Sequence, residues 1–227
     1  MSASRETTGG DVMSADGPHQ DQPLATVGTP LDAADAAAVL VHGRGATAQS
    51  IIGMADAFYH HGIAYVAPQA AGNSWYPNSF LAPIESNEPG LSSGLQAIDA
   101  AIEKVNDVDI STDQTMLAGF SQGACLASEY VARNATRYGG LAVLSGGLVG
   151  PGDTPRDYEE SLDGTPVLIG CSDVDPHIPI ERVHETADVF EGMDADVTKR
   201  IYEGMGHGVN EDEIEHVSEM VRDLVED

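Results

Sequence analysis

The sequence predicts an α/β fold, with a mostly parallel, doubly wound sheet and helices on both faces. Two observations carry this prediction: short apolar runs alternate with segments of helical periodicity, and the runs are apolar almost throughout. Strands buried on both faces have this composition, because helices cover each side of a parallel sheet. A length of 227 residues suits one such domain and is too short for two domains that each have a full hydrophobic core.

Each expected element follows from one of these two patterns. The run AAAVLVH is typical of a buried strand, whereas Leu95, Ile98, Ile102 and Val105 recur at helical spacing. The segments predicted as strands are 36–42, 63–67, 115–120, 141–145, 166–171 and 196–202. The segments predicted as helices are 48–61, 92–106, 122–134, 180–192 and 211–225.

The first 32 residues differ in composition from the rest of the chain. They are rich in Ser, Thr, Gly, Asp and Gln and contain no apolar stretch typical of a secretion signal. We therefore expect a flexible acidic leader over residues 1–32 and a single domain over residues 33–227. The two cysteines, Cys125 and Cys171, form no CxxC pair and are expected to be small buried thiols, which indicates a reduced, cytoplasmic location.

The chain is strongly acidic. Ten Lys and Arg residues stand against 37 Asp and Glu, a formal net charge of −27. This charge repels phosphate backbones, which argues against nucleic acid as a partner. The sequence also has no run of about eighteen apolar residues, so integral membrane association is not expected. Lysine occurs only at positions 104 and 199. A strongly acidic surface with almost no lysine indicates a halophilic protein, in which molar salt screens the repulsion between its negative charges. An ordinary acidic mesophilic protein is the alternative.

The segment GFSQG at 119–123 matches the pattern G-x-S-x-G between a predicted strand and a predicted helix. A sharp turn in this setting raises the serine hydroxyl above the edge of the sheet. Gly119 and Gly123 lack the Cβ atoms that would clash in such a turn. Ser121 would then begin a helix, where free N–H groups favour a developing anion. A glycine-rich turn with a merely capping serine is the alternative.

Candidates for a base and an orienting acid follow Ser121 in the chain. Asp173 and Asp175 come after the predicted strand 166–171, and His207 comes after the strand 196–202. The carboxyl ends of parallel strands share one edge of the sheet, so we expect His207 to reach Ser121 with one of these two acids behind it. The same three side chains with His177 offer oxygen and nitrogen ligands for a metal as an alternative.

The segment HGRG at 42–45 follows the first predicted strand. A backbone N–H from this loop, with that of Gln122, is expected to form an oxyanion hole. Arg44 is the first choice for the loop donor and Gly45 the second. The Arg44 side chain either meets an anionic group of the substrate or pairs with surface acids.

A long segment, residues 70–91, carries Trp75, Tyr76 and Phe80 and is predicted to be a loop. Loops of this length in a compact domain are commonly functional. We expect these three aromatic residues to wall a substrate pocket, with packing on the core as the alternative.

The sequence resembles the phospholipase/carboxylesterase family of α/β hydrolases, which includes the acyl-protein thioesterases. The resemblance covers about residues 39–225 through the segments VLVHGRGAT, APQAAGNSWYP, LAGFSQGACLA, SDVDPHIP and YEGMGHG. It implies a single-domain α/β-hydrolase fold and a triad of Ser121, Asp175 and His207, because the family's acid is the Asp before Pro in D-P-x-[VI]-P. It also supports Arg44 in the oxyanion hole, and it implies hydrolysis that needs no metal or other cofactor.

Two departures limit what the resemblance implies about substrate. Gly170-Cys171 stands where the thioesterases commonly have His-Gly, and the 70–91 segment looks closer to bacterial and archaeal carboxylesterases of the family. The expected function is that of a serine carboxylesterase acting on a small-molecule ester or thioester through an acyl-enzyme. A lysophospholipase or acyl-protein thioesterase is the alternative within the family, and a non-catalytic binding module on the same fold is the alternative outside it. A monomer and a small homo-oligomer are both compatible with the sequence.

Overall fold

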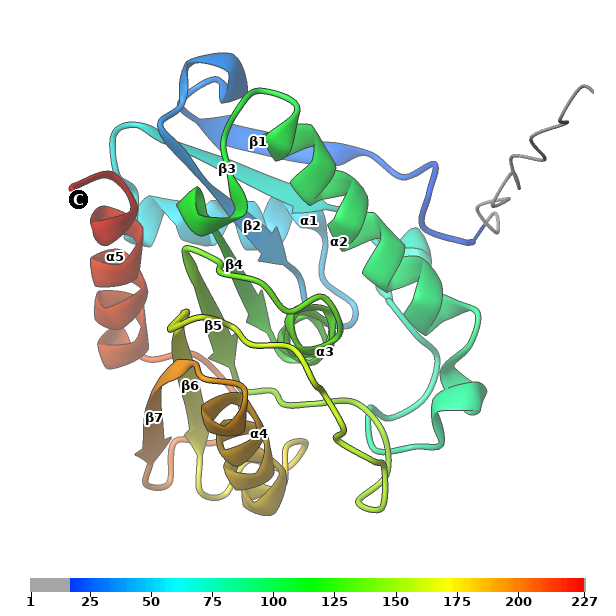
Figure 1. Cartoon of the computed structure of the whole chain (residues 1–227). Coiled ribbons are helices and arrows are strands. Elements are labelled where there is room, and N and C mark those ends of the chain that lie inside the picture. The colour runs from blue at the N-terminus through cyan, green and yellow to red at the C-terminus, as the bar shows by residue number, and fades with distance from the viewer. Residues whose placement is uncertain (1–16, 227) are drawn as a thin grey trace, which may run out of the picture.

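A seven-stranded sheet runs through the molecule in the order β1-β3-β2-β4-β5-β6-β7 (Figure 1). The computed structural model describes residues 17–226. The strands are β1 (Leu24–Gly28), β2 (Ala36–Val41), β3 (Ile63–Pro68), β4 (Thr115–Phe120), β5 (Gly140–Leu144), β6 (Pro166–Ser172) and β7 (Asp196–Tyr202). β1 pairs antiparallel with β3, and all other neighbours are parallel. The predicted α/β class with a mostly parallel sheet is confirmed.

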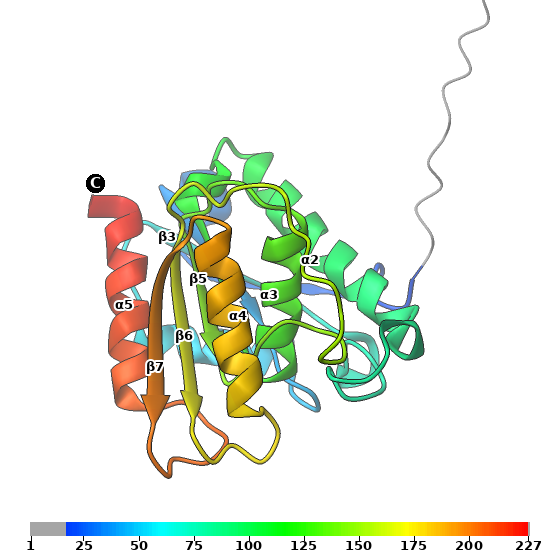
Figure 2. The same ribbon diagram turned by 60° about the horizontal axis from the view of Figure 1, so that its bottom comes forward.

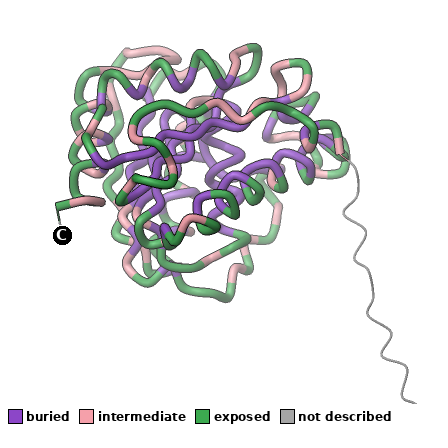
Figure 3. Tube along the Cα trace, turned by 90° about the horizontal axis from the view of Figure 1, so that it is seen from above, coloured by how far each residue is buried: buried purple, intermediate pink, exposed green. Residues whose placement is uncertain are grey.

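Helices cover both faces of this sheet, as Figure 2 shows for α4 and α5 on opposite sides of β6. The helices are α1 (Ala48–Ile52), α2 (Gly90–Asn106), α3 (Gln122–Arg133), α4 (Ile180–Gly192) and α5 (Glu211–Glu226). Side chains of β2 alternate between the two layers: Val39 and Val41 pack with α2 and α3, whereas Ala38 and Leu40 pack with α1 and α5. The buried strands therefore lie at the centre of the tube in Figure 3, with exposed turns around them.

The helix predicted over 48–61 is much shorter in the structure. α1 ends at Ile52 and continues as a 3-10 helix over Gly53–Ala57. Gly53 lowers helix propensity at the point where the α-helix stops. The apolar residues that suggested the longer helix, including Ile52 and Phe58, are still buried. The apolar pattern thus identified the buried side chains correctly and the backbone conformation wrongly.

The prediction that residues 1–32 form a flexible leader is wrong for residues 17–32; residues 1–16 lie outside the described part of the chain. β1 adds to the sheet along the edge of β3. Before it, the buried His19 donates its backbone N–H to Ser93 Oγ at 2.9 Å. The strand LATVG was missed because it is an edge strand, half-exposed and short, with no continuous apolar run.

The segments that carry the predicted site residues all leave the same edge of the sheet. β2, β4, β6 and β7 are parallel, so the loops after their carboxyl ends lie together. Within residues 17–226, no helix is both long and apolar enough to span a bilayer.

Candidate active site

Ser121 occupies the tight turn between β4 and α3, and the predicted strand-turn-helix is confirmed. Its backbone has φ 56° and ψ −120°, a conformation that is strained for a residue with a side chain. A Cβ atom on Gly119 would lie 2.5 Å from the carbonyl carbon of Gly123, and one on Gly123 would collide with the carbonyl oxygen of Val41. The two glycines therefore allow the turn that presents the Ser121 hydroxyl.

A continuous chain of hydrogen bonds joins Ser121, His207 and Asp175. Ser121 Oγ lies 2.9 Å from His207 Nε2, and His207 Nδ1 lies 2.7 Å from Asp175 Oδ2. A proton on Nδ1 satisfies both bonds, since Nδ1–H then donates to the carboxylate and Nε2 accepts from the hydroxyl. The Asp175 side chain is fully buried, whereas that of His207 keeps 18% of its surface exposed. The imidazole thus bridges a buried acid and an accessible hydroxyl.

The second oxygen of Asp175 is also bonded. Its Oδ1 accepts the backbone N–H groups of His177 at 2.8 Å and Ile178 at 3.1 Å. Burial raises the pKa of Asp175, but the bonds from His207 and these two amides outweigh it and hold the pKa below its usual range. Asp173 has a different role, because its Oδ1 accepts the N–H of Gly204 at 2.8 Å. Of the two acids that the strand order offered, Asp175 is the one that contacts His207.

Serine hydroxyls from two neighbouring strand ends hold the loop that carries His207. Gly206 donates its N–H to Ser172 Oγ at 3.1 Å, and Ser145 Oγ donates to the Gly208 carbonyl at 3.2 Å. Both serines follow or end strands at the same sheet edge, a signal in the sequence that the prediction did not use. The loop is therefore fixed on both sides of the imidazole.

Glu213, in the first turn of α5, is fully buried behind this loop. Its Oε2 accepts the N–H of Asn210 at 2.9 Å, while its buried Oε1 has no partner among the described residues. Burial raises its pKa to about 7. A side chain at Gly170 would collide with the Glu213 carboxyl group. Glu213 thus gives a physical reason for glycine at position 170, one of the two departures from the thioesterase pattern.

Cys171 lies beside the acid of the site. Its thiol donates to Asp175 Oδ2 at 3.8 Å, and its side chain is fully buried. Burial raises the pKa of this thiol to about 12, so it stays protonated at neutral pH. Both cysteines are buried and unpaired with each other, as expected for small buried thiols.

Two backbone amides beside Ser121 are available to a ligand. Neither the Arg44 N–H nor the Gln122 N–H donates to any group within residues 17–226. Gln122 is the first residue of α3, where helical N–H groups have no partner in the helix. Gly45, the second choice for a donor, is occupied, since its N–H donates to the Asn73 carbonyl at 2.7 Å.

A cavity of about 550 Å³ opens at Ser121 and His207. Tyr76 and Phe80 line it, together with Phe120 and Ile178. The expectation that Trp75 also walls this pocket is wrong, since Trp75 is fully buried and does not line the cavity.

Trp75 is a core residue that fastens the 70–91 segment to the motif HGRG. Its indole N–H donates to the His42 carbonyl at 2.8 Å, and its ring packs against the rings of His42 and His19. The Gln122 side chain accepts a hydrogen bond from the backbone N–H of Trp75 at 3.0 Å and donates one to the Tyr76 carbonyl at 2.8 Å. Gln122 thereby holds the pocket wall against the turn that carries Ser121.

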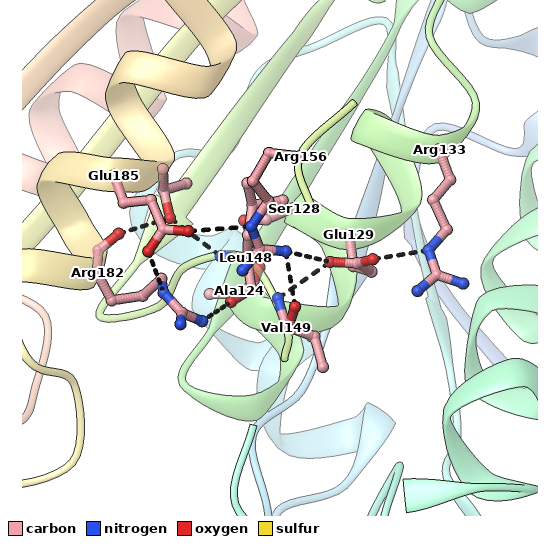
Figure 4. Close-up of polar contacts among 10 residues, drawn as sticks. Ala124, Ser128, Glu129, Arg133, Leu148, Val149, Arg156, Arg182 and Glu185 are labelled. Carbon is pink, nitrogen blue, oxygen red and sulfur yellow. Dashed lines mark hydrogen bonds and ion pairs between the residues drawn. The ribbon is translucent and has the colours of Figure 1, made fainter. Parts of the chain in front are cut away.

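A buried ionic cluster, shown in Figure 4, lies behind Phe80. The Arg182 guanidinium lies 5.7 Å from the centre of the Phe80 ring and bonds Glu185 through Nε at 2.9 Å. Glu185 also accepts from Arg156 Nε at 3.0 Å, and Arg156 lies 3.9 Å from Glu129 on α3. This cluster was not predicted from the sequence, because it joins three separate stretches of the chain, around Glu129, Arg156 and Arg182. It connects α3 and α4 behind the pocket wall.

The four side chains offered as alternative metal ligands do not form a ligand group. No set of three or more His, Cys, Asp or Glu within residues 17–226 is arranged to hold a metal ion. Asp173 bonds Gly204, and Asp175 bonds His207. The His177 ring packs edge-on against His207, with centroids 4.8 Å apart.

Comparison with known proteins shows the family of the chain. The sequence profile of the phospholipase/carboxylesterase family matches residues 22–225. The chain belongs to this family. Its structure is similar to the crystal structure of a phospholipase/carboxylesterase from Dyadobacter fermentans, with a TM-score of 0.85 and 39% identity over 88% of this chain and 96% of that one. The chain shares only its fold with Arabidopsis thaliana SOBER1, with a TM-score of 0.68 at 18% identity over 84% of this chain and 99% of that one.

Among curated members of the family, the chain is similar to acyl-protein thioesterase 1 of two yeasts. The Saccharomyces cerevisiae protein is 26% identical over 136 residues, which is 59% of this chain and 60% of that protein. The Kluyveromyces lactis protein is 32% identical over 129 residues, which is 56% of this chain and 57% of that protein. The chain thus matches somewhat more than half the length of these thioesterases.

Proposed function

We propose that this protein is a serine hydrolase that cleaves carboxylic esters or thioesters through an acyl-enzyme. The observation that carries the proposal is the unbroken hydrogen-bonded chain from Ser121 through His207 to Asp175. Membership of the phospholipase/carboxylesterase family supports it. A binding module without catalysis is disfavoured, because a nucleophile, a base and an orienting acid are all in contact.

The mechanism assigns one step to each group. His207 Nε2 takes the Ser121 proton as Oγ attacks the carbonyl carbon, while Asp175 holds the tautomer and stabilises the imidazolium. The N–H groups of Arg44 and Gln122 bind the tetrahedral oxyanion. The imidazolium then protonates the departing alcohol or thiol. A water molecule, deprotonated by His207, attacks the acyl-enzyme, and Ser121 Oγ leaves with the proton that His207 returns to it.

The pocket suits a small-molecule ester. Tyr76, Phe80 and Ile178 give the 550 Å³ cavity an apolar wall for the acyl or alcohol part. Acyl-protein thioesterase activity, which the names of the yeast relatives indicate for those proteins, and lysophospholipase activity are narrower forms of the same chemistry. The triad supplies the nucleophile and the base, and the two backbone amides stabilise the oxyanion. The proposed reaction therefore uses no cofactor.

We also propose a cytoplasmic setting of high salt concentration. The support is the net charge of −27, the scarcity of lysine and the two buried thiols.

Hydrolysis of p-nitrophenyl esters of graded chain length, assayed in dilute buffer and in molar KCl, tests the proposed function. Wild type should release p-nitrophenol with a preferred chain length, and Ser121→Ala or His207→Ala should lower kcat by roughly 10³–10⁶ while the protein stays folded. Ser218→Ala, on α5 and outside the wall of the active-site cavity, is the matched serine control and should retain activity. Full activity in folded Ser121→Ala protein would exclude this mechanism.

A further inference from the structure

The active-site cavity contains no carboxylate among the residues that line it. Fifteen described residues form its wall, and none of them is Asp or Glu, although the chain has 37 such residues. The ionisable nitrogen groups in the wall are those of Arg44, His177 and His207. The cavity is therefore a local region without negative side chains on a strongly acidic molecule.

Arg44 is held in place at this cavity by uncharged oxygens. Its guanidinium donates to Ser74 Oγ at 3.1 Å, to the Pro77 carbonyl at 3.0 Å and to the Asn78 carbonyl at 2.6 Å. It also lies 5.9 Å from the centre of the Tyr76 ring. These contacts fix its position and leave its charge uncompensated. A guanidinium carries more N–H donors than these three bonds use, and Arg44 is exposed.

The sequence left open whether the Arg44 side chain pairs with surface acids. Within residues 17–226, Arg44 forms no such ion pair. Other arginines of the described chain do pair with carboxylates: Arg133, Arg156, Arg182 and Arg222. Arg137 and Arg200 share the lack of a carboxylate partner there, but neither lines the cavity. Arg44 thus combines a fixed position, spare donors and a place in the cavity wall.

We propose that Arg44 binds an anionic oxygen group of the substrate, a carboxylate or a phosphate, so that the preferred ester carries a negative charge besides its scissile bond. A guanidinium matches both groups, because its N–H donors form charge-assisted bonds to their oxygens. The acids elsewhere on the surface oppose such a ligand weakly, since physiological salt screens charges beyond about 8 Å. This inference rests on the proposed function for the ester, but its binding part can be measured separately.

Two pairs of esters, each with one anionic and one neutral member, test the proposal and distinguish the two anions. One pair is the p-nitrophenyl monoester of adipic acid and the p-nitrophenyl ester of adipamic acid, in which a carboxamide replaces the carboxylate. The other pair is 1-butyrylglycerol 3-phosphate and 1-butyrylglycerol. Wild type should favour the anionic member of at least one pair by roughly tenfold or more in kcat/KM, the size of one charge-assisted hydrogen bond.

The substitution Arg44→Gln should bring that ratio close to one. The ratio is the readout, so any general loss of activity in this variant cancels. Arg200→Gln, which removes the same charge from β7, should keep the wild-type ratio. A wild-type ratio near or below one in both pairs overturns the proposal, and so does a high ratio that Arg44→Gln leaves unchanged.

Calorimetric binding of the adipic and adipamic esters to Ser121→Ala separates this inference from the proposed function. Tighter binding of the anionic ester, lost in Ser121→Ala/Arg44→Gln, supports the anion site even if wild type hydrolyses neither ester. Equal binding of both esters, with the glycerol pair also equal, overturns the anion site even if wild type hydrolyses p-nitrophenyl esters well.

Discussion

Two buried carboxyl groups near the imidazole have opposite ionisation preferences. Asp175 accepts four hydrogen bonds at its two oxygens, and those from His207 and the two backbone amides hold its pKa below the usual range. Glu213 accepts one at Oε2 and has no partner for Oε1 within the described chain. Its buried charge is therefore poorly compensated, and its pKa rises to about 7. The number of donors that each carboxylate receives accounts for the difference.

Glu213→Gln should stabilise the protein above pH 7. The pKa of Glu213 is near 4.5 when unfolded and about 7 when folded. Its contribution to stability is therefore fully present below pH 4.5 and is lost as the pH rises through 7, a change of about 3 kcal/mol. The Tm advantage of the variant over wild type should grow from pH 4.5 to pH 8. Glu215→Gln, exposed on the same helix, is the control, and an equal gain there would attribute the effect to net charge alone.

At the scale of elements, the segment 17–23 packs against the start of the 70–91 segment. His19 Nδ1 accepts the N–H of Ala71 at 2.9 Å, and its Nε2 lies 2.9 Å from the Trp75 carbonyl. Tyr76, the next residue, lines the active-site cavity. Burial lowers the pKa of His19, so the folded protein keeps this histidine neutral. A region of the chain that the sequence suggested was a leader therefore supports the pocket wall.

His19→Ala should lower stability by about 2–4 kcal/mol, because it leaves the Ala71 N–H and the Trp75 carbonyl without partners. Thermal denaturation should show a Tm fall of roughly 5–15 °C at pH 8. The His19 contribution is present above its ordinary pKa of 6.5 and is lost as the pH falls through its lower folded value, so the Tm difference should narrow toward pH 5. His184→Ala, exposed on α4, should change Tm little. A similar loss in both variants would argue against a specific role for His19.

At the scale of the whole molecule, charge opposes compactness. Acidic side chains outnumber basic ones by 27, and three of the eight arginines are used in the cluster around Glu129 and Glu185. The remaining excess of negative charge repels itself across the surface, and salt weakens this repulsion by shortening the screening length from about 10 Å at 0.1 M to about 3 Å at 1 M.

Raising KCl from about 0.1 to about 2 M, roughly a twentyfold increase in ionic strength, should therefore raise Tm steeply. Sucrose, which carries no charge, is the control for effects on hydration and should give a smaller rise than KCl. A Tm that stays flat or falls with KCl would refute adaptation to high salt.

The sequence determined most of the fold and proposed the site. Continuous apolar runs identified the five inner strands, β2 to β6, to within a residue or two, because burial on both faces demands such runs. The bounds of β7 were also predicted, although this strand lies at the edge of the sheet and is largely exposed. The order of Ser121, the acids and His207 at strand ends identified the residues that meet, since parallel strands present their carboxyl ends at one edge. The family resemblance pointed to Asp175 over Asp173, and the structure places Asp175 against His207.

Tertiary structure decided what depends on distant contacts. β1 is a strand because β3 offers it an edge, and Trp75 is buried because His19, His42 and Gln122 surround it. The spare charge of Arg44 and the raised pKa of Glu213 likewise follow from neighbours far away in the sequence or from burial. Local patterns report local propensity and burial, whereas partners for a side chain are chosen only when the chain has folded.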